Sequence, residues 1–234
     1  MFRFLIAVAS ILGASAAAQM PSALDDAIAA SEPPPTLRIA FLGRLQTQTA
    51  WRDIHYDARR PRGDRFSILR GEGEDAELDA IVQDWSADAA PDGRLWADQL
   101  RSRLAKGGRA TRQDGRMTAW FAPATTVGDA PLDTWMASHL SGRLTLDEDA
   151  RFVEQIQFTA ERAIDLGGAR VTEFAQVYDL DIAPIYDVAF VRRFTLQGEG
   201  WSGWRTEARV LRFELLEADF HMATDAEQSL RTRP

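Results

Sequence analysis

The 234-residue sequence contains no cysteine, a single lysine and only three histidines. Without cysteine the chain can form no disulfide bond, no thiolate metal site and no N-terminal thioether lipid anchor, so its fold depends on core burial. The three histidines, His55, His139 and His221, are scattered, and none of them belongs to an H-x-x-x-H or H-E-x-x-H zinc motif. We therefore predict no metal ion and no other cofactor.

Positive charge is also scarce, since 35 acidic residues face 27 basic ones and the formal net charge is −8. This balance excludes a basic nucleic-acid-binding protein and disfavours tight attachment to anionic lipid headgroups. One local group of arginines, Arg59, Arg60 and Arg62, can still meet phosphate groups. Hydrophobic residues make up 45% of the chain and charged residues 26%, which are the proportions of a globular protein.

The first 18 residues have the pattern of a secretory signal peptide. Arg3 precedes the apolar run 5–12, and the small residues 14–18 offer a cleavage site after Ala18. This run is too short to cross a hydrocarbon layer of ~30 Å, which takes about 20 apolar residues. We therefore expect a periplasmic or secreted protein that has no membrane span once residues 1–18 are removed.

The rest of the chain divides into a short leading segment, one domain and a tail. Residues 19–36 combine a capping box at Ser22–Asp25, which favours a short helix, with the proline-rich link 33–35. Residues 37–223 contain no long linker and are expected to form a single α+β domain. The polar residues 224–234 are expected to fray.

Alternating hydrophobicity predicts a series of antiparallel strands in this domain. The predicted strands cover or centre on residues 37–49, 51–57, 66–68, 116–122, 152–158, 171–178 and 188–196. Residues 207–215 fit either a strand or a helix, and their alternation favours the strand. Turns are expected at 147–149, 167–168 and 183–184.

Helical periodicity appears between Gly71 and Gly108. Residues 75–85 and 92–106 each place apolar side chains on one side of a helix, and residues 132–140 predict a further short helix. The expected fold is a curved antiparallel sheet, a half-barrel meander, with a short N-terminal helix and a helical insertion packed on one face.

This order of elements resembles that of the periplasmic lipoprotein carriers and related envelope sensors. A signal peptide, a short helix, a long strand over 37–49, a helical insertion and a C-terminal meander follow one another. The resemblance implies a concave apolar surface that holds acyl chains. The insertion at 75–106 departs from the simplest members, and no functional residue is transferred by the resemblance.

Surplus aromatic residues are the candidates for a ligand site, because the chain has seven tryptophans and an indole ring joins an apolar body to a polar edge. The alternative for these residues is packing in the core and at its rim. The candidate ligand-binding residues are Trp120, Phe121, Trp135, Trp201 and Trp204.

Residues 198–203 spell the Gly-x-Gly-x-x-Gly dinucleotide fingerprint, with Asp219 downstream. That motif works only where a helix begins at the last glycine, inside a parallel βαβ unit. Here the preceding strand belongs to a meander and Trp201 adds bulk to the loop, so we favour a glycine-rich hairpin turn over nucleotide binding.

Two sets of residues that contain carboxylates support a weaker hypothesis, in which the protein is an enzyme. Asp179 and Asp181 share one face of a strand with Asp187 beyond a turn, and His55 and Asp57 share a face of another strand. Their alternatives are a solvated strand end and a surface pair, and we assign no catalytic residue.

Three functions therefore stand open. The favoured one is an exported non-catalytic protein that binds an apolar ligand or a lipidated partner in the concave sheet. The alternatives are a structural or interaction protein of the cell envelope, and a hydrolase that uses a carboxylate pair.

Overall fold

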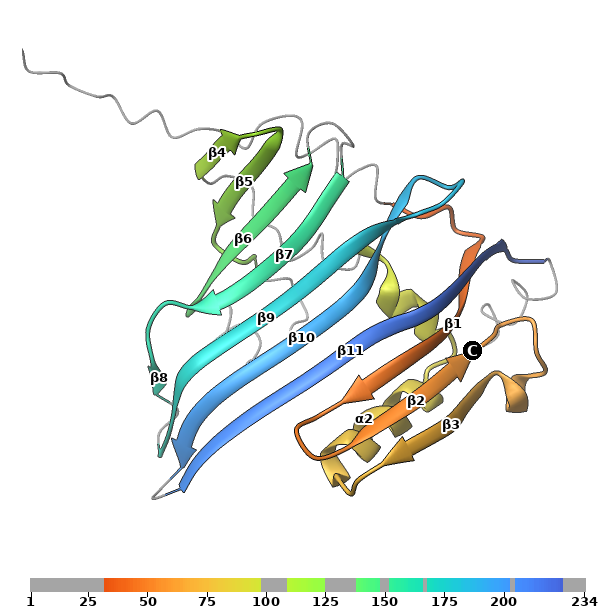
Figure 1. Cartoon of the computed structure of the whole chain (residues 1–234), viewed down its shortest axis with the longest axis horizontal. Helices are drawn as coiled ribbons and strands as arrows, with labels where there is room; N and C mark the ends of the chain where they lie inside the picture. Colours follow the sequence, from red (N-terminus) through yellow and green to blue (C-terminus); the bar gives the residue numbers. More distant parts are fainter. Residues whose placement is uncertain are drawn as a thin grey trace, which may run out of the picture.

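The computed structural model describes residues 32–97, 109–124, 138–147, 152–165, 168–202 and 205–224. The expected signal peptide, most of the expected N-terminal helix and nearly all of the expected tail lie outside these residues. Within them the chain forms an 11-stranded sheet that carries one α-helix and two short 3-10 helices (Figure 1).

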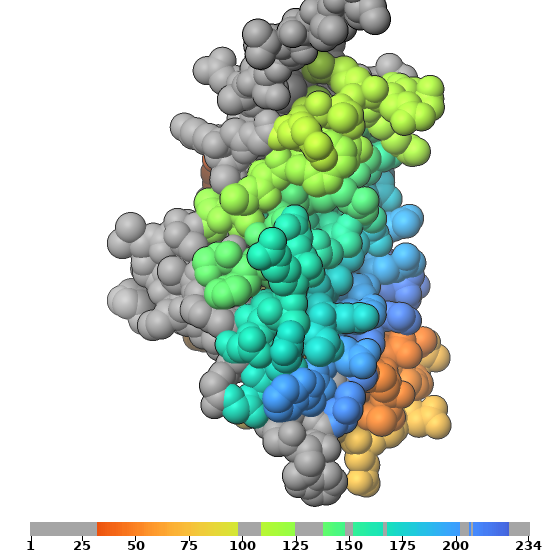
Figure 2. Space-filling view, turned by 90° about the vertical axis from the view of Figure 1, so that its left-hand side faces the viewer, coloured from red at the N-terminus to blue at the C-terminus, as the bar shows by residue number. Residues whose placement is uncertain are grey.

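The sheet is antiparallel and open. This confirms the antiparallel sheet of the expected α+β fold, but the described residues are mostly strand and contain one α-helix. Its strands follow the order β3-β2-β1-β11-β10-β9-β7-β6-β5-β4, and the short β8 pairs with β9. Figure 2 shows the same succession from the side, from β4 and β5 at the top to β1–β3 at the lower right. The strands are β1 (Leu37–Gln46), β2 (Trp51–Tyr56), β3 (Phe66–Glu72), β4 (Arg109–Gln113), β5 (Arg116–Phe121), β6 (Leu140–Asp147), β7 (Phe152–Ala160), β8 (Ile164–Asp165), β9 (Ala169–Ala183), β10 (Val188–Ser202) and β11 (Arg205–Met222).

The first and last strands of the domain lie side by side. β1 pairs with β11 from Leu37↔Met222 to Gln46↔Arg212, with a bulge after Leu42. This pairing attaches the N-terminal hairpins to the C-terminal meander, so the two halves of the chain form one sheet. It also confirms that residues 207–215 form a strand and not a helix, because β11 is long enough to pair with both β1 and β10.

The helix α2 (Ala76–Ala87) covers β1 and β2 on one face of the sheet (Figure 1). Its buried residues are Leu78, Val82 and Trp85, which recur at helical spacing. The helix predicted over 75–85 is thus confirmed. Trp85 packs against the rings of Phe41 and Phe213, with ring centroids 6.0 and 5.1 Å apart.

The second predicted helix, over 92–106, is wrong in its first part. Residues Pro91–Leu95 form the 3-10 helix η2, and Trp96 then bridges to Phe190 of β10 in an extended conformation. Leu95 and Trp96 are both buried although they are adjacent, and an α-helix would turn them about 100° apart. The extended backbone at Trp96 instead places its ring 6.2 Å from that of Phe220. Residues 98–106 lie outside the described residues.

The strands β4, β6 and β8 were not predicted from the sequence. Leu140, expected at the end of a helix over 132–140, begins β6, and residues 132–137 of that helix lie outside the described part. The side chains of Leu144 and Leu146 in β6 are buried, and they pack in a second core cluster with Met117, Ile156 and Phe158. Phe194 of β10 contacts both this cluster and the one beneath α2, so the core is continuous along the sheet.

Candidate functional site

A hollow of about 370 Å³ lies where β9, β10 and β11 approach the hairpin between β10 and β11. The strand register builds it, because Gly198 of β10 lies between Phe174 of β9 and Arg209 of β11. Cross-strand neighbours share one face of a sheet, so these three positions point to the same side. Leu196, two residues earlier on β10, faces the same way and adds a second apolar wall.

Gly198 keeps this hollow open. A Cβ atom added at Gly198 would find only the carbonyl oxygen of Glu173 within 4 Å, at 3.9 Å. The space above the glycine is therefore free to take a side chain or a ligand group. Trp201 lines the outer end of the hollow and is 43% exposed, so its indole ring is available to a ligand that enters from solvent.

The hollow lies on the face of the sheet that carries α2. Arg209, in the same row as Gly198, donates from Nη1 to Glu77 of α2, with Nη1 3.0 Å from Oε2 and 3.2 Å from Oε1. Both side chains are exposed, so the ion pair contributes little to stability, at most about 1 kcal/mol. The contact shows that the first turn of α2 lies at the rim of the hollow.

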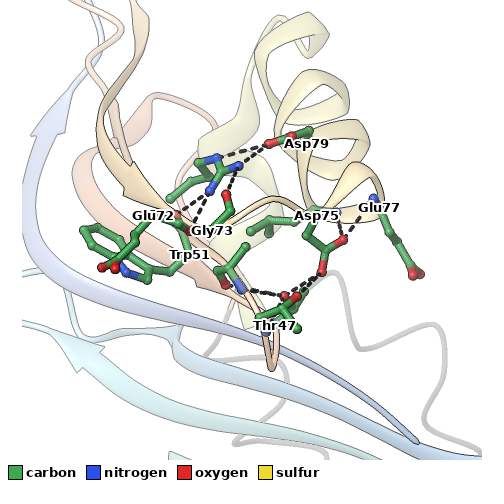
Figure 3. Close-up of polar contacts among 11 residues, drawn as sticks. Thr47, Trp51, Glu72, Gly73, Asp75, Glu77 and Asp79 are labelled. Atoms are coloured by element: carbon green, nitrogen blue, oxygen red, sulfur yellow. Dashed lines mark hydrogen bonds and ion pairs between the residues drawn. The ribbon is translucent and has the colours of Figure 1, made fainter. Parts of the chain in front are cut away.

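The first turn of α2 is itself held firmly on the sheet (Figure 3). The Asp75 side chain caps the helix by accepting from the backbone N–H groups of Glu77 and Leu78, at 3.0 and 3.1 Å. Its other oxygen accepts from the hydroxyls of Thr47 and Thr49, at 2.7 and 3.2 Å. The Thr47 hydrogen bond is the main reason that the pKa of Asp75 is lowered. The cap is thus a fixed negative charge at the positive end of the helix.

A single arginine fastens the loop before the helix. Arg52 donates to the carbonyl oxygens of Trp51, Glu72 and Gly73, at 2.8, 3.0 and 3.1 Å, and its guanidinium pairs with Asp79 of α2 (Figure 3). These contacts hold β2, β3 and α2 together at one corner. Glu77 therefore reaches toward Arg209 from a well-anchored helix.

Trp120 and Phe121 line a different hollow, of about 640 Å³, at the ends of β5 and β6. The Trp120 ring is covered by the guanidinium of Arg109, whose Cζ lies 4.9 Å from the ring centroid. Phe121 is only 6% exposed and packs edge to face against Phe158, so most of its surface belongs to the core. His139 adds a polar group to the lining of this hollow.

The structure therefore does not bring the candidate aromatic residues together. Trp201 lines the hollow on β9–β11, Trp120 and Phe121 line the other hollow, and Trp135 and Trp204 lie outside the described residues. Sequence reasoning missed Phe174, Leu196 and Gly198 as site residues. Their alternation marked a strand face, but only the register between strands shows that they meet.

Asp179 and Asp181, two of the acidic residues considered for catalysis, are held by other groups. Asp179 accepts from Nε2 of Gln155 at 2.8 Å and lies 3.8 Å from Arg193, while Asp181 lies 4.0 Å from Arg192. Neither carboxylate, nor that of Asp187, lines a hollow described here. Among the described residues, no cluster of three or more His, Cys, Asp or Glu side chains could hold a metal ion.

Asp57 pairs with arginine rather than with His55. Its carboxylate accepts from the backbone N, the Nε and an Nη of Arg59, at 3.0, 2.9 and 3.2 Å. Burial raises the pKa of Asp57, but the Arg59 hydrogen bonds outweigh burial and leave it lowered. A carboxylate that stays ionised in this way is unsuited to act as a general acid.

The glycine-rich segment belongs to a β-hairpin, as expected, but Gly198 and Gly200 lie within a strand of the hairpin and not in its turn. Residues 198–202 belong to β10, and β11 begins at Arg205 and returns antiparallel to it. The helix that a dinucleotide fingerprint requires does not follow, since the next element is a strand.

No protein-family model, curated protein or solved structure matches this chain. In the described part of the chain, no helix combines the length and the apolar character needed to cross a membrane.

Proposed function

We propose that this is an exported, non-catalytic envelope protein that binds an apolar ligand, or the acyl chain of a lipidated partner, on a half-barrel-like sheet. The site is the hollow on β9–β11, on the face that carries α2. The observation that carries the proposal is the open space above Gly198, beside Phe174 and Leu196. The order of elements, which resembles that of lipoprotein carriers, supports the same assignment.

The lining suits a ligand with an apolar body and one polar end. Phe174, Leu196 and Val171 supply apolar surface, whose burial by a ligand is worth about 25 cal/mol per Å². Arg170, Arg209 and Glu199 make the rim polar, and each arginine already faces a carboxylate, Asp165 at 3.7 Å and Glu77 at 3.0 Å. The polar end of the ligand would therefore meet hydrogen-bonding groups and no unpaired charge. This arrangement of an apolar floor and a few polar groups is typical of small-molecule sites.

Replacing Gly198 with leucine tests the site directly. The new side chain would project into free space, so we expect Gly198→Leu to fold normally and to bind N-phenyl-1-naphthylamine, a neutral apolar probe, at least tenfold more weakly. Fluorescence titration of the purified mature protein gives the two dissociation constants.

The matched control is Gln197→Leu, which adds the same side chain at an exposed position on the opposite face of β10. This variant should bind the probe like the unchanged protein. Equal affinity in all three proteins would exclude the hollow as the ligand site. It would favour the alternative, an envelope interaction protein, which requires no ligand in the hollow.

A further inference from the structure

A third hollow, of about 260 Å³, is lined by three arginines and lies at the opposite end of α2 from the Asp75 cap. Arg38 comes from β1, Arg62 from the 3-10 helix η1 (Arg62–Asp64), and Arg65 directly follows η1. The other walls are the rings of Tyr56 and Phe66 and the residues at the end of α2. We infer that this hollow, the arginine pocket, is a binding site for a phosphate group.

One of the three arginines is a buried cation. Arg38 is only 6% exposed, and its Nη1 donates to the carbonyl oxygen of Leu37 at 2.7 Å. A guanidinium group carries five N–H donors and does not lose its proton in a protein. Its charge is therefore permanent and is held in place by the surrounding core, which is the condition for a preorganised anion site.

The neighbouring arginines divide into two groups with different partners. Arg59 pairs with Asp57 and with Asp219, at 2.9 and 2.8 Å, and Arg60 lies 4.0 Å from Asp57. Arg62, by contrast, forms no ion pair within the residues that the structure describes. These three arginines are neighbours in the sequence but have different surroundings in the structure. Arg59 and Arg60 lie beside carboxylates, whereas Arg62 lines the arginine pocket.

Arg65 is oriented by a single backbone contact. Its Nε donates to the carbonyl oxygen of Arg60 at 3.0 Å. Arg62 lies in the short 3-10 helix η1 and Arg65 directly after it, so both belong to one loop, whereas Arg38 belongs to strand β1 of the sheet. A ligand in the pocket would therefore bridge the η1 loop and strand β1.

The negative groups near the pocket do not cancel this charge. Asp88 is the acidic residue of the lining, and it already pairs with Arg94 through Nε at 3.0 Å. The C-terminal end of α2 adds a partial negative charge of about one half. Arg62 and Arg65 place two guanidinium groups against this one carboxylate, so the lining is positive even without counting Arg38, in a protein whose net charge is −8.

The placement of the arginines favours a tetrahedral anion. They line the cavity from two sides, Arg38 from β1 and Arg62 and Arg65 from the η1 loop, so a phosphate group can offer each of them an oxygen, whereas a carboxylate offers only two oxygens in one plane. The phosphate can belong to a small soluble ester or to a lipid headgroup. This inference does not depend on the apolar site, because the two hollows share no lining residue.

Titration of the mature protein with inorganic phosphate at constant ionic strength tests the pocket. We expect saturable binding in calorimetry and a rise in melting temperature that equivalent sodium chloride does not produce. Arg62→Gln and Arg65→Gln should each weaken binding about ten- to a hundredfold, the range for losing a charge-assisted hydrogen bond. Both residues lie at or near the surface, so these variants are expected to fold. Arg38→Gln is not used, because it removes a buried group and can therefore destabilise the fold itself.

The matched control is Arg143→Gln, which removes an exposed arginine on β6 and should leave the affinity unchanged. Comparing glycerol 3-phosphate with dihexanoyl phosphatidic acid then identifies the source: equal affinity indicates a soluble ester, and at least tenfold tighter lipid binding indicates a headgroup. Absence of phosphate-specific binding, or equal affinity in the Arg62→Gln, Arg65→Gln and Arg143→Gln variants, would overturn the inference.

Discussion

Replacing Gly73 with alanine is expected to lower the free energy of unfolding by about 3 kcal/mol. Gly73 joins β3 to the Asp75 cap of α2 and has a φ angle of 79°, in the left-handed region that alanine adopts at a cost of about 1 to 2 kcal/mol. In addition, an alanine Cβ would lie 2.1 Å from the carbonyl oxygen of Thr49. The clash is with backbone, so the β1–β2 loop or the start of α2 must move.

That movement would also disturb the Asp75 cap and the Arg52 contacts, because both depend on the position of this loop. Urea unfolding followed by tryptophan fluorescence measures the loss, since Trp85 lies in the core beneath α2. The control is Gly63→Ala, where an added Cβ meets nothing within 4 Å and φ is not positive. The control should stay within about 0.5 kcal/mol of the unchanged protein. Equal effects at Gly63 and Gly73 would contradict the explanation.

Replacing Asp53 with asparagine is expected to cost about 2 kcal/mol at neutral pH. Asp53 is 1% exposed, and its two oxygens accept from Arg44, at 2.7 and 3.1 Å, and from Nε of Arg70. Both guanidinium groups lie over the ring of Trp51, with Cζ 4.4 and 5.8 Å from its centroid. Asparagine keeps the shape but removes the charge, and the partial exposure of both arginines limits the loss.

The effect of this substitution should depend on pH in one direction. The Arg44 hydrogen bond lowers the pKa of Asp53 more than burial raises it, so the folded carboxyl group binds its proton less readily than the unfolded one. The unfolded pKa is about 3.9, and below it the unfolded chain takes up protons first. The stabilisation is therefore complete above about pH 5 and is lost as the pH falls through the folded pKa.

Urea unfolding of the unchanged protein and of Asp53→Asn at several pH values between 3 and 7 measures this difference. The difference in free energy of unfolding between the two proteins should shrink as the pH falls toward 3. Asp84→Asn is the control, because its carboxylate pairs with Arg94 but is 68% exposed. We expect Asp84→Asn to lower the free energy of unfolding by less than about 1 kcal/mol. A gap for Asp53→Asn that is constant with pH would show that its charge does not stabilise the fold.

Local features of this fold were predictable from the sequence. The spacing of Leu78, Val82 and Trp85 identifies α2, because residues three and four apart share one face of a helix. The long strands β9 and β10 were also predictable, because their apolar and polar residues alternate. β4 escaped prediction because it is a polar edge strand with almost no buried side chain, so it carries no hydrophobic pattern.

Segments whose conformation depends on distant partners were not predictable. Trp96 is extended because it bridges to Phe190, nearly a hundred residues later in the chain. The spacing within 92–106 matched a helix, but local periodicity cannot register a contact of this kind. The pairing of β1 with β11 likewise joins the two ends of the domain.

At both candidate sites the sequence shows which residue types are present, and only the tertiary structure shows which of them meet. The residue types were visible in the sequence: an aromatic surplus, a glycine-rich hairpin and a group of arginines. Which of them meet depends on register, and bulges between Val191 and Arg193 and between Glu199 and Gly200 shift the pairing of β9 with β10. A shift of one residue turns every side chain to the other face, so Phe174, Gly198 and Arg209 form a row only in the folded sheet. The gathering of Arg38, Arg62 and Arg65 around one cavity has the same origin, because β1 and the η1 loop meet there only in the folded chain.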